Sequence, residues 1–277
     1  MKTGGEGSSL ITTPRILVHF SCGAASAVAW KVTEERYGKE CEVEAVYADM
    51  SQNEHPDNAR FMVDVERWVG KKVTVLSHPK YKNIDTLFLD TKFIVAPSGA
   101  ICTRIMKREV GESYQRSGDR HVFGYTADER ARIIRFNANN PDLNSLWVLA
   151  IAGITKEHCY RILSAAGIEL PTMYKLGYGH NNCIGCVKGG KGYWNKIRRD
   201  FPEVFARRAL VQREVGVKFG GGNGFFLDEL DPDVGRNDPP EDIECGPYCS
   251  RYTGMVDDAV SKITSMQDAP PLPKVLR

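Results

Sequence analysis

The sequence predicts an α/β protein: a doubly wound, mostly parallel five-stranded sheet with helices on both faces and a cysteine-containing C-terminal extension. Two observations predict this class. Short apolar runs alternate along the chain with segments whose apolar residues recur at helical spacing. The first run is followed at once by a turn of small residues. Strands joined through such helices form right-handed crossovers and parallel sheets, which bind ligands at the carboxyl ends of their strands.

The first expected unit is a strand, a turn and a helix. The apolar run at residues 15–20 predicts a buried strand, and residues 21–26 (Ser-Cys-Gly-Ala-Ala-Ser) predict a tight turn. The helix that follows is expected to end at Gly38, because glycine often stops a helix. Its inward residues recur at helical spacing: Ala25, Val28, Ala29, Val32 and Arg36.

Four more strands are expected, at residues 43–48, 72–76, 121–125 and 147–152. A helix between the first two of these is expected to end at Gly70, and it carries Phe61, Met62, Val65, Trp68 and Val69. We divide the chain into a disordered segment at residues 1–14, a nucleotide-binding domain at residues 15–230 and a flexible tail at residues 231–277.

Composition limits the function classes. The chain has 277 residues, 42% of them apolar and 26% charged, as expected for a soluble globular protein. Its 37 basic and 35 acidic residues give a formal net charge of +2, so no global field attracts nucleic acid or a membrane. The first residues resemble no targeting signal, and no apolar run reaches bilayer length. We expect a cytoplasmic protein without a membrane partner, whose eight cysteines do not form a disulfide framework and whose clustered cysteines act as ligands or catalysts.

The turn at residues 21–26 lies where such a sheet binds its ligand. Small residues let backbone N–H groups approach an anion, two hydroxyl groups add donors, and the next helix contributes its positive end. Ser21, Gly23, Ala24 and Ser26 are therefore candidate phosphate-binding residues. The alternative is that a strand-to-helix turn simply needs small residues.

Cys183 and Cys186 form a C-x-x-C pair, which puts two thiols within reach of one metal or of each other. Cys102 lies about eighty residues earlier, in the run Cys102-Thr-Arg-Ile-Met-Lys107. Iron–sulfur clusters take three or four thiolates, zinc takes two to four, and buried inert thiols are the third alternative.

Several motifs in this order resemble the phosphoadenylyl sulfate (PAPS) reductase-like family of the adenine nucleotide α-hydrolase, or PP-loop, superfamily. Residues 21–26 resemble a degenerate S-G-G-x-D-S pyrophosphate loop, with Cys22 in place of glycine and Ala25 in place of aspartate. Residues 47–56 resemble D-T-G-x-E-x-P, and residues 124–132 resemble G-x-R-x-x-E-S-x-x-R. The "C-T-x-x-x-K" run and the C-x-x-C pair follow the pattern of the cluster-bearing members.

The resemblance implies a nucleotide site. It places an acidic contact for the adenosine at Asp49 and phosphate or sulfate contacts at Lys107, Gly124, Glu129 and Arg132. Two alternatives stay open. Asp49 and Glu54 can instead cap the next helix, and Glu129 and Arg132, three residues apart, can form an ordinary ion pair.

The resemblance also implies a [4Fe-4S] cluster held by Cys102, Cys183 and Cys186, with zinc as the alternative. The tandem cysteine of the family is missing because Ile101 stands in its place. Cys249 in the tail is our candidate for the fourth ligand. Cys22, Cys41 and Cys159 are expected to be packing residues without a role in the chemistry.

Glu244-Cys245-Gly246 resembles the "E-C-G-I/L-H" segment whose cysteine attacks the sulfate sulfur in sulfonucleotide reductases. The resemblance therefore implies Cys245 as the catalytic nucleophile, although a ligand role and no role stay open. The closing histidine of that segment is replaced, since Tyr248 stands near its place.

Three functions follow. The first is a reductase acting on an adenine sulfonucleotide (PAPS or APS), with a thioredoxin-like thiol donor. The second is a sulfurtransferase that uses ATP with Mg²⁺ to activate a nucleobase or metabolite and delivers sulfur from a cluster. Under this second function, the basic run at residues 188–199 is a candidate contact for RNA. The missing aspartate at Ala25 counts against the second function, and the single cysteine at Cys102 counts against the cluster form of the first. The third is a nucleotide-binding sensor without catalysis.

Overall fold

The computed structural model describes residues 13–96, 99–220, 224–236, 238–239, 243, 245–246 and 248. Three of the predictions concern residues outside these ranges: disorder at the N-terminus up to residue 12, the ligand role of Cys249 and the flexibility of most of the tail.

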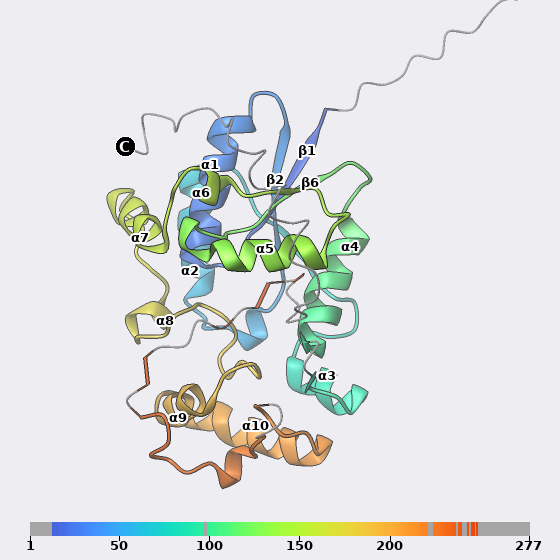
Figure 1. Ribbon diagram of the computed structural model, residues 1–277, viewed down its shortest axis with the longest axis vertical. Coiled ribbons are helices and arrows are strands. Elements are labelled where there is room, and N and C mark those ends of the chain that lie inside the picture. The colour runs from blue at the N-terminus through green and yellow to red at the C-terminus, as the bar shows by residue number, and fades with distance from the viewer. Residues whose placement is uncertain are drawn as a thin grey trace, which may run out of the picture.

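The described residues contain a five-stranded sheet whose paired strands are all parallel (Figure 1). Its order is β3-β2-β1-β6-β7, so the chain first builds outward from β1 and then returns to add strands on the other side. This reversal makes the edge between β1 and β6 a topological switch point, the usual place for a ligand. The predicted fold class is confirmed. The strands are β1 (Arg15–His19), β2 (Glu42–Ala48), β3 (Thr74–Leu76), β6 (Arg120–Val122) and β7 (Ser145–Leu146).

The predicted strand at residues 147–152 is wrong. The fifth strand, β7, ends at Leu146, and most of that segment forms the short helix α6 (Val148–Ile151). Val148 and Leu149 pack into the same core as α1, so the run is apolar because it is buried. Apolar character alone does not separate a buried strand from a buried helical turn. A separate antiparallel pair, β4 (Val95–Ala96) with β5 (Gly99–Ala100), was not expected.

Helices cover both faces of the sheet. On one face, α1 (Ala24–Tyr37), α2 (Asn58–Val69) and α7 (Lys156–Ala165) pack over a core that includes alternate residues of β2, Val43 and Ala45. Glu44 lies between these two and therefore points the other way. There it accepts a hydrogen bond from Tyr114, at the end of α4 (Val110–Tyr114), so α4 lies on the opposite face. α2 ends at Gly70 in the left-handed conformation, as predicted.

A second core lies away from the sheet, where α9 (Lys191–Asp200) packs on α10 (Pro202–Val215) and α10 packs on α3 (Ile84–Thr91) (Figure 1). It includes the buried cysteines of the C-x-x-C pair. The other helical segments are η1 (Ser51–Asn53), η2 (Thr103–Glu109), η3 (Ala127–Glu129), α5 (Arg130–Asn139), α8 (Thr172–Lys175) and η5 (Leu227–Glu229). Among the described residues, no helix is both long and apolar enough to cross a membrane.

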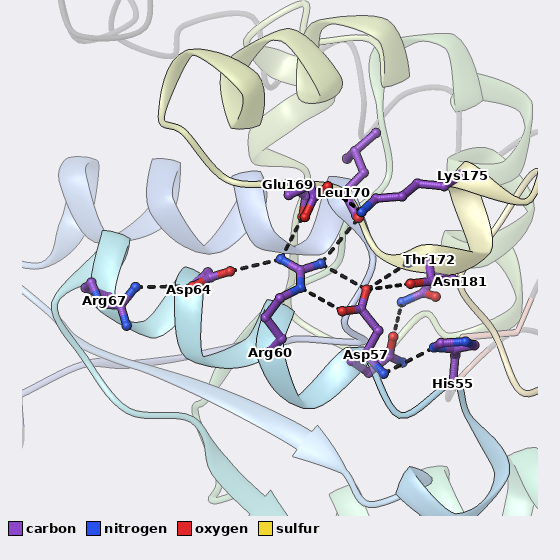
Figure 2. A network of polar contacts seen from close by, with 11 residues as sticks. His55, Asp57, Arg60, Asp64, Arg67, Glu169, Leu170, Thr172, Lys175 and Asn181 are labelled. Carbon is purple, nitrogen blue, oxygen red and sulfur yellow. Dashed lines mark hydrogen bonds and ion pairs between the residues drawn. The ribbon is translucent and has the colours of Figure 1, made fainter.

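A polar network ties the start of α2 to the segment that precedes the C-x-x-C pair (Figure 2). The Asp57 carboxylate accepts hydrogen bonds from Arg60 at 2.6 Å and from the backbone N–H of Thr172 at 2.9 Å. Arg60 also donates to the carbonyl oxygens of Glu169 and Leu170 at 3.1 and 3.3 Å. These bonds join residues more than 100 positions apart in the sequence, and they fix the approach of the cysteine segment to the sheet.

Candidate functional site

A pocket opens at the carboxyl ends of β1, β2 and β6, at the switch point of the sheet. Its walls come from the turn after β1, the ends of β2 and β3, the start of α5, residues 179–182 and, in the tail, Ile243, Cys245 and Gly246. Nine of the predicted nucleotide and catalytic residues line it: Ser21, Gly23, Ala24, Ser26, Lys107, Gly124, Glu129, Arg132 and Cys245. The structure therefore collects in one place residues that lie more than 200 positions apart in the sequence.

The turn after β1 is held in shape by its own hydroxyl groups. The Ser26 hydroxyl donates to the Gly23 carbonyl at 2.9 Å and accepts from the Ser21 backbone N–H at 3.1 Å. Cys22, which stands where the PP-loop pattern has glycine, has a φ of 53°, in the left-handed region that glycine adopts most easily. The N-terminus of the fourteen-residue helix α1 follows, so its backbone N–H groups point toward an anion in the pocket.

Gly124 lets a second loop approach this turn. A Cβ atom at Gly124 would lie 2.6 Å from the backbone nitrogen of Ser26 and 2.9 Å from the carbonyl carbon of Ala25. Both contacts are to backbone, which cannot swing aside as a side chain does. Glycine at position 124 is therefore required by the close packing of the two loops, in addition to any contact with a ligand.

Two predicted residues at the start of α5 pair with each other. The Arg132 guanidinium forms an ion pair with Glu129 at 2.5 Å and lies 4.3 Å from the centre of the Tyr125 ring. Glu129 also accepts from the backbone N–H and the hydroxyl group of Thr126, both at 2.9 Å. The ordinary ion pair named as an alternative is thus present, within the wall of the pocket. Lys156, which the sequence did not single out, also lines the pocket, and it donates to the Gly179 carbonyl at 2.7 Å.

Four thiols belong to one buried cluster beside the pocket. Cys102, Cys183 and Cys186 are at most 8% exposed, and Cys245 packs against the same core. Of the four, only Cys245 lines the pocket. Its Sγ atom lies 3.5 Å from the Nζ atom of Lys107. The tail thus brings its thiol to the place where the nucleotide loop and the C-x-x-C segment meet.

The charges around Cys245 favour its thiolate. A hydrogen bond from the Cys186 thiol lowers the pKa of Cys245 well below its ordinary value; burial opposes this shift, and the Lys107 ammonium group supports it. The same hydrogen bond, together with burial, raises the pKa of Cys186. Burial alone would lower the pKa of Lys107, but the surrounding thiolates and Glu54 raise it above its ordinary value. Cys245 is therefore the thiol of this cluster whose thiolate form is favoured.

An unusual helix positions Lys107. Segment η2 (Thr103–Glu109) is a π-helix, which closes hydrogen bonds between residues five apart. Cys102 and Lys107 are five residues apart, so this winding brings them round to the same face of the helix. Thr103, on the neighbouring position, has its hydroxyl oxygen 3.9 Å from the Sγ atom of Cys245. The spacing of the "C-T-x-x-x-K" run thus matches the helix type that the structure adopts.

The donor set has the chemistry that the predicted cluster needs. Within the described ranges, no three His, Cys, Asp or Glu side chains are arranged to hold a single metal ion. A [4Fe-4S] cluster binds each thiolate through a different iron and so spaces its ligands more widely than a single ion does. Four thiols that share one buried core, three of them close enough to interact with Lys107, fit that donor set. The fourth of them is Cys245; the predicted fourth ligand, Cys249, lies outside the described residues.

Of the two acidic residues that follow β2, Glu54 lies in the pocket, whereas the sequence indicated Asp49. The Asp49 carboxylate accepts hydrogen bonds from the hydroxyl groups of Ser51 and Ser77, at 2.7 and 2.8 Å, and it does not line the pocket. Glu54 is 7% exposed and does line it. Neither residue caps α2, whose N-cap is Asp57. The sequence offered one indication of Glu54, namely its position, because this residue follows the end of β2 as closely as ligand residues usually do.

Glu54 is held by a chain of hydrogen bonds. Its Oε2 atom accepts from the Tyr47 hydroxyl group at 2.8 Å and from the Asn58 amide at 2.9 Å. The Asn58 side-chain oxygen accepts from Asn181, which also donates to the carbonyl oxygen of Cys22 at 2.7 Å. Burial raises the pKa of the Glu54 carboxyl group, and nearby Lys107 opposes this effect. The network connects the Glu54 carboxylate, through Asn58 and Asn181, to the turn at residues 21–26.

His19, which also lines the pocket, is paired with a second histidine behind it. The Nε2 atom of His19, at the end of β1, lies 3.0 Å from the Nδ1 atom of His121 on β6. The His19 ring stacks on Phe123 with the ring centres 4.4 Å apart, and Tyr248 meets it edge-on. Burial, with a contribution from His121, lowers the pKa of His19 to about 3, so both rings are neutral at physiological pH. The sequence analysis missed this pair because the two residues belong to different strands.

Comparison with known proteins leaves the function open. No protein-family model matches the chain. The chain is similar to Uncharacterized protein MJ0066 of Methanocaldococcus jannaschii, with 24% identity over 221 residues. The match covers 76% of this chain and 44% of that protein, so the chain spans less than half the length of this relative.

Proposed function

We propose that this protein is a sulfonucleotide reductase-like enzyme that acts on an adenine nucleotide carrying a phosphosulfate group. One observation carries the proposal: the pocket that contains the turn at residues 21–26 also contains the Cys245 thiol, 3.5 Å from Lys107. The turn and the start of α1 offer N–H groups to the phosphate. The lysine offsets the charge of the sulfate that faces the thiol.

The proposed reaction begins when the Cys245 thiolate attacks the sulfate sulfur. An S–S bond forms, the S–O bond to the phosphate breaks, and its electron pair leaves with the nucleotide as AMP or its 3′-phosphate derivative. Cys245 is left as a thiosulfonate. A dithiol donor of the thioredoxin type then attacks the Cys245 sulfur and releases sulfite, and the second thiol of the donor resolves the mixed disulfide, so the two electrons come from that donor.

The metal proposal concerns the neighbouring thiols. Cys102, Cys183 and Cys186 would hold a [4Fe-4S] cluster beside Lys107; a zinc ion, the alternative, would require these three thiols to move closer together. Such a cluster, when bound, would supply a charged, redox-active group next to the sulfate subsite. Lys107 itself orients the sulfate, since its ammonium group lies between the thiols and the pocket.

The test is anaerobic incubation with ³⁵S-labelled adenylyl sulfate and a dithiol, followed by measurement of labelled sulfite. Replacing the nucleophile in Cys245→Ser should lower the rate by on the order of a thousandfold or more. Cys41→Ser is the matched control, because Cys41 precedes β2 and does not line the pocket. Sulfite release at the normal rate by Cys245→Ser would remove the proposal.

A second candidate is the ATP-dependent sulfurtransferase, and it is favoured by the contact between Cys186 and Cys245. If Cys245 serves as the fourth ligand of a cluster, it no longer acts as the nucleophile. Formation of AMP and pyrophosphate from ATP, without sulfite from adenylyl sulfate, would support this candidate. Nucleotide binding without any turnover would support the sensor.

A further inference from the structure

Glu54 has one carboxylate oxygen committed and one open to the pocket. Both of its hydrogen bonds, from Tyr47 and Asn58, go to Oε2. Among the described residues, none donates to Oε1, and no cationic side chain comes within ion-pair distance of the carboxylate. Because the residue is 93% buried and lines the pocket, Oε1 faces the space that a ligand would fill.

The position of Glu54 relates it to the phosphate-binding turn. Asn58 and Asn181 link its carboxylate to the carbonyl oxygen of Cys22, which is part of that turn. The turn itself carries no acid, because Ala25 stands where the PP-loop pattern has aspartate. Compared with the PP-loop pattern, the pocket therefore lacks an acidic residue in the turn but has one, Glu54, beside it.

The negative charge of the Glu54 carboxylate limits which ligands can lie beside it. A buried carboxylate repels a phosphate chain unless a cation lies between them. Lys107 is the nearest candidate, and its ammonium group is directed to Cys245, at 3.4 Å from the carbonyl oxygen and 3.5 Å from the sulfur. Mg²⁺ in nucleotide sites is commonly bound by one or two carboxylates together with phosphate oxygens and water.

We propose that Glu54 binds a divalent cation, Mg²⁺, that enters with the phosphate chain of the nucleotide, and so takes the place of the acid missing at Ala25. The inference rests on the proposed function only in requiring an adenine nucleotide in the pocket. It extends the ligand class to nucleotides with at least two phosphates bound as their magnesium complexes.

The experiment measures ADP affinity by calorimetry, with Mg²⁺ and with EDTA. For the unaltered protein we expect affinity to be about tenfold or more higher with Mg²⁺, and the gain to be smaller for AMP. Glu54→Gln keeps the shape of the side chain and its ability to hydrogen-bond but removes the charge, so the gain should disappear. Asp49→Asn is the matched control, because Asp49 lies just after the same strand, outside the pocket, and should retain the full gain.

Mn²⁺ gives a second readout, and its first arm uses the unaltered protein. Electron paramagnetic resonance should show bound Mn²⁺ only when ADP is present, and Glu54→Gln should abolish that signal. Equal ADP affinity with Mg²⁺ and EDTA in the unaltered protein would overturn the inference. A Glu54→Gln variant that keeps the full magnesium dependence of ADP binding would also overturn it. So would a Glu54→Gln variant that binds ADP as tightly as the unaltered protein both with EDTA and with Mg²⁺, because Glu54 would then act as a neutral hydrogen-bond donor. Normal sulfite release by Cys245→Ser overturns the reductase instead and leaves this result unchanged.

Discussion

The two ends of the sheet both bury charged groups, and they treat them in opposite ways. At the amino end, Arg15 at the start of β1 donates to both oxygens of Asp119 and to Glu44. The side chains of Arg15 and Asp119 are each only 3% exposed. At the carboxyl end, Glu54 and Lys107 are almost as deeply buried, but no ion pair joins them among the described residues. We call the amino end closed, because its buried charges are paired with one another, and the carboxyl end open, because Glu54 and Lys107 form no ion pair with each other.

This difference separates a stabilising site from a binding site. A buried ion pair whose hydrogen bonds are all satisfied contributes to a defined structure and leaves nothing for a ligand. Buried charges without a matching partner reduce stability, and they persist where a ligand completes them. The open end coincides with the switch point of the sheet, where a ligand is expected from topology alone.

The closed end should give the largest change in stability. Arg15→Met leaves the buried Asp119 carboxylate without its partner, and we expect the free energy of unfolding to fall by about 3–5 kcal/mol. Urea denaturation followed by circular dichroism measures this change. Nucleotide affinity of the protein that remains folded should be unaffected. A loss well under about 1 kcal/mol would show that the amino end is not a stabilising site.

A steric change at the open end should have an intermediate effect and act on binding. Gly124→Ala pushes a Cβ atom into the backbone of Ser26, at a cost of about 1–3 kcal/mol. We expect nucleotide affinity to fall by about tenfold or more as the turn moves. The comparison is Gly111→Ala, since a Cβ atom there meets no atom closer than 3.9 Å and Gly111 lines the same pocket. Equal affinities for the two variants would contradict the packing argument.

Acid should weaken the open end through its histidine pair, and the effect per pH unit is the smallest of the three. The pKa of His19 is about 3 in the folded protein and about 6.5 when unfolded. The unfolded chain therefore binds more protons in this range, so stability is full above pH 6.5 and is lost as the pH falls toward 3. Each pH unit in this range lowers the free energy of unfolding by up to about 1.4 kcal/mol. His19→Gln should remove this part of the slope in denaturation measured from pH 7 to 4.5; an unchanged slope would show that His19 is protonated in the folded state.

Much of the open end could be predicted from the sequence because its parts are local. The turn at residues 21–26 follows an apolar strand and precedes a helix, so position and residue size were sufficient to place it. Cys245 was found through a short resemblance in the tail. Glu129 and Arg132 were named both as pocket residues and as an ion pair, and the structure shows them in both situations.

What the sequence could not predict depends on contacts between distant segments or on the type of helix. Asp49 and Glu54 both follow β2, and only the bonds from Asn58 and the packing of the pocket distinguish them. The closed end was missed entirely, since Arg15 and Asp119 lie 104 positions apart. Segment 147–152 was assigned to a strand because a buried helical turn has the same apolar composition. The π-helix leaves no pattern in seven residues that distinguishes it from an α-helix.

The distance in sequence between Cys245 and the rest of the pocket has a consequence for biosynthesis. Lys107, its neighbour in space, is made 138 residues earlier. A growing chain begins to fold from its amino end while it is still being synthesised. The sheet, the turn at residues 21–26 and the Glu54 carboxylate are therefore synthesised before the Cys245 thiol leaves the ribosome. If the protein acts as proposed, nascent chains bind the nucleotide before they can react with it, and a chain that is cut short before residue 245 is inert toward the sulfonucleotide.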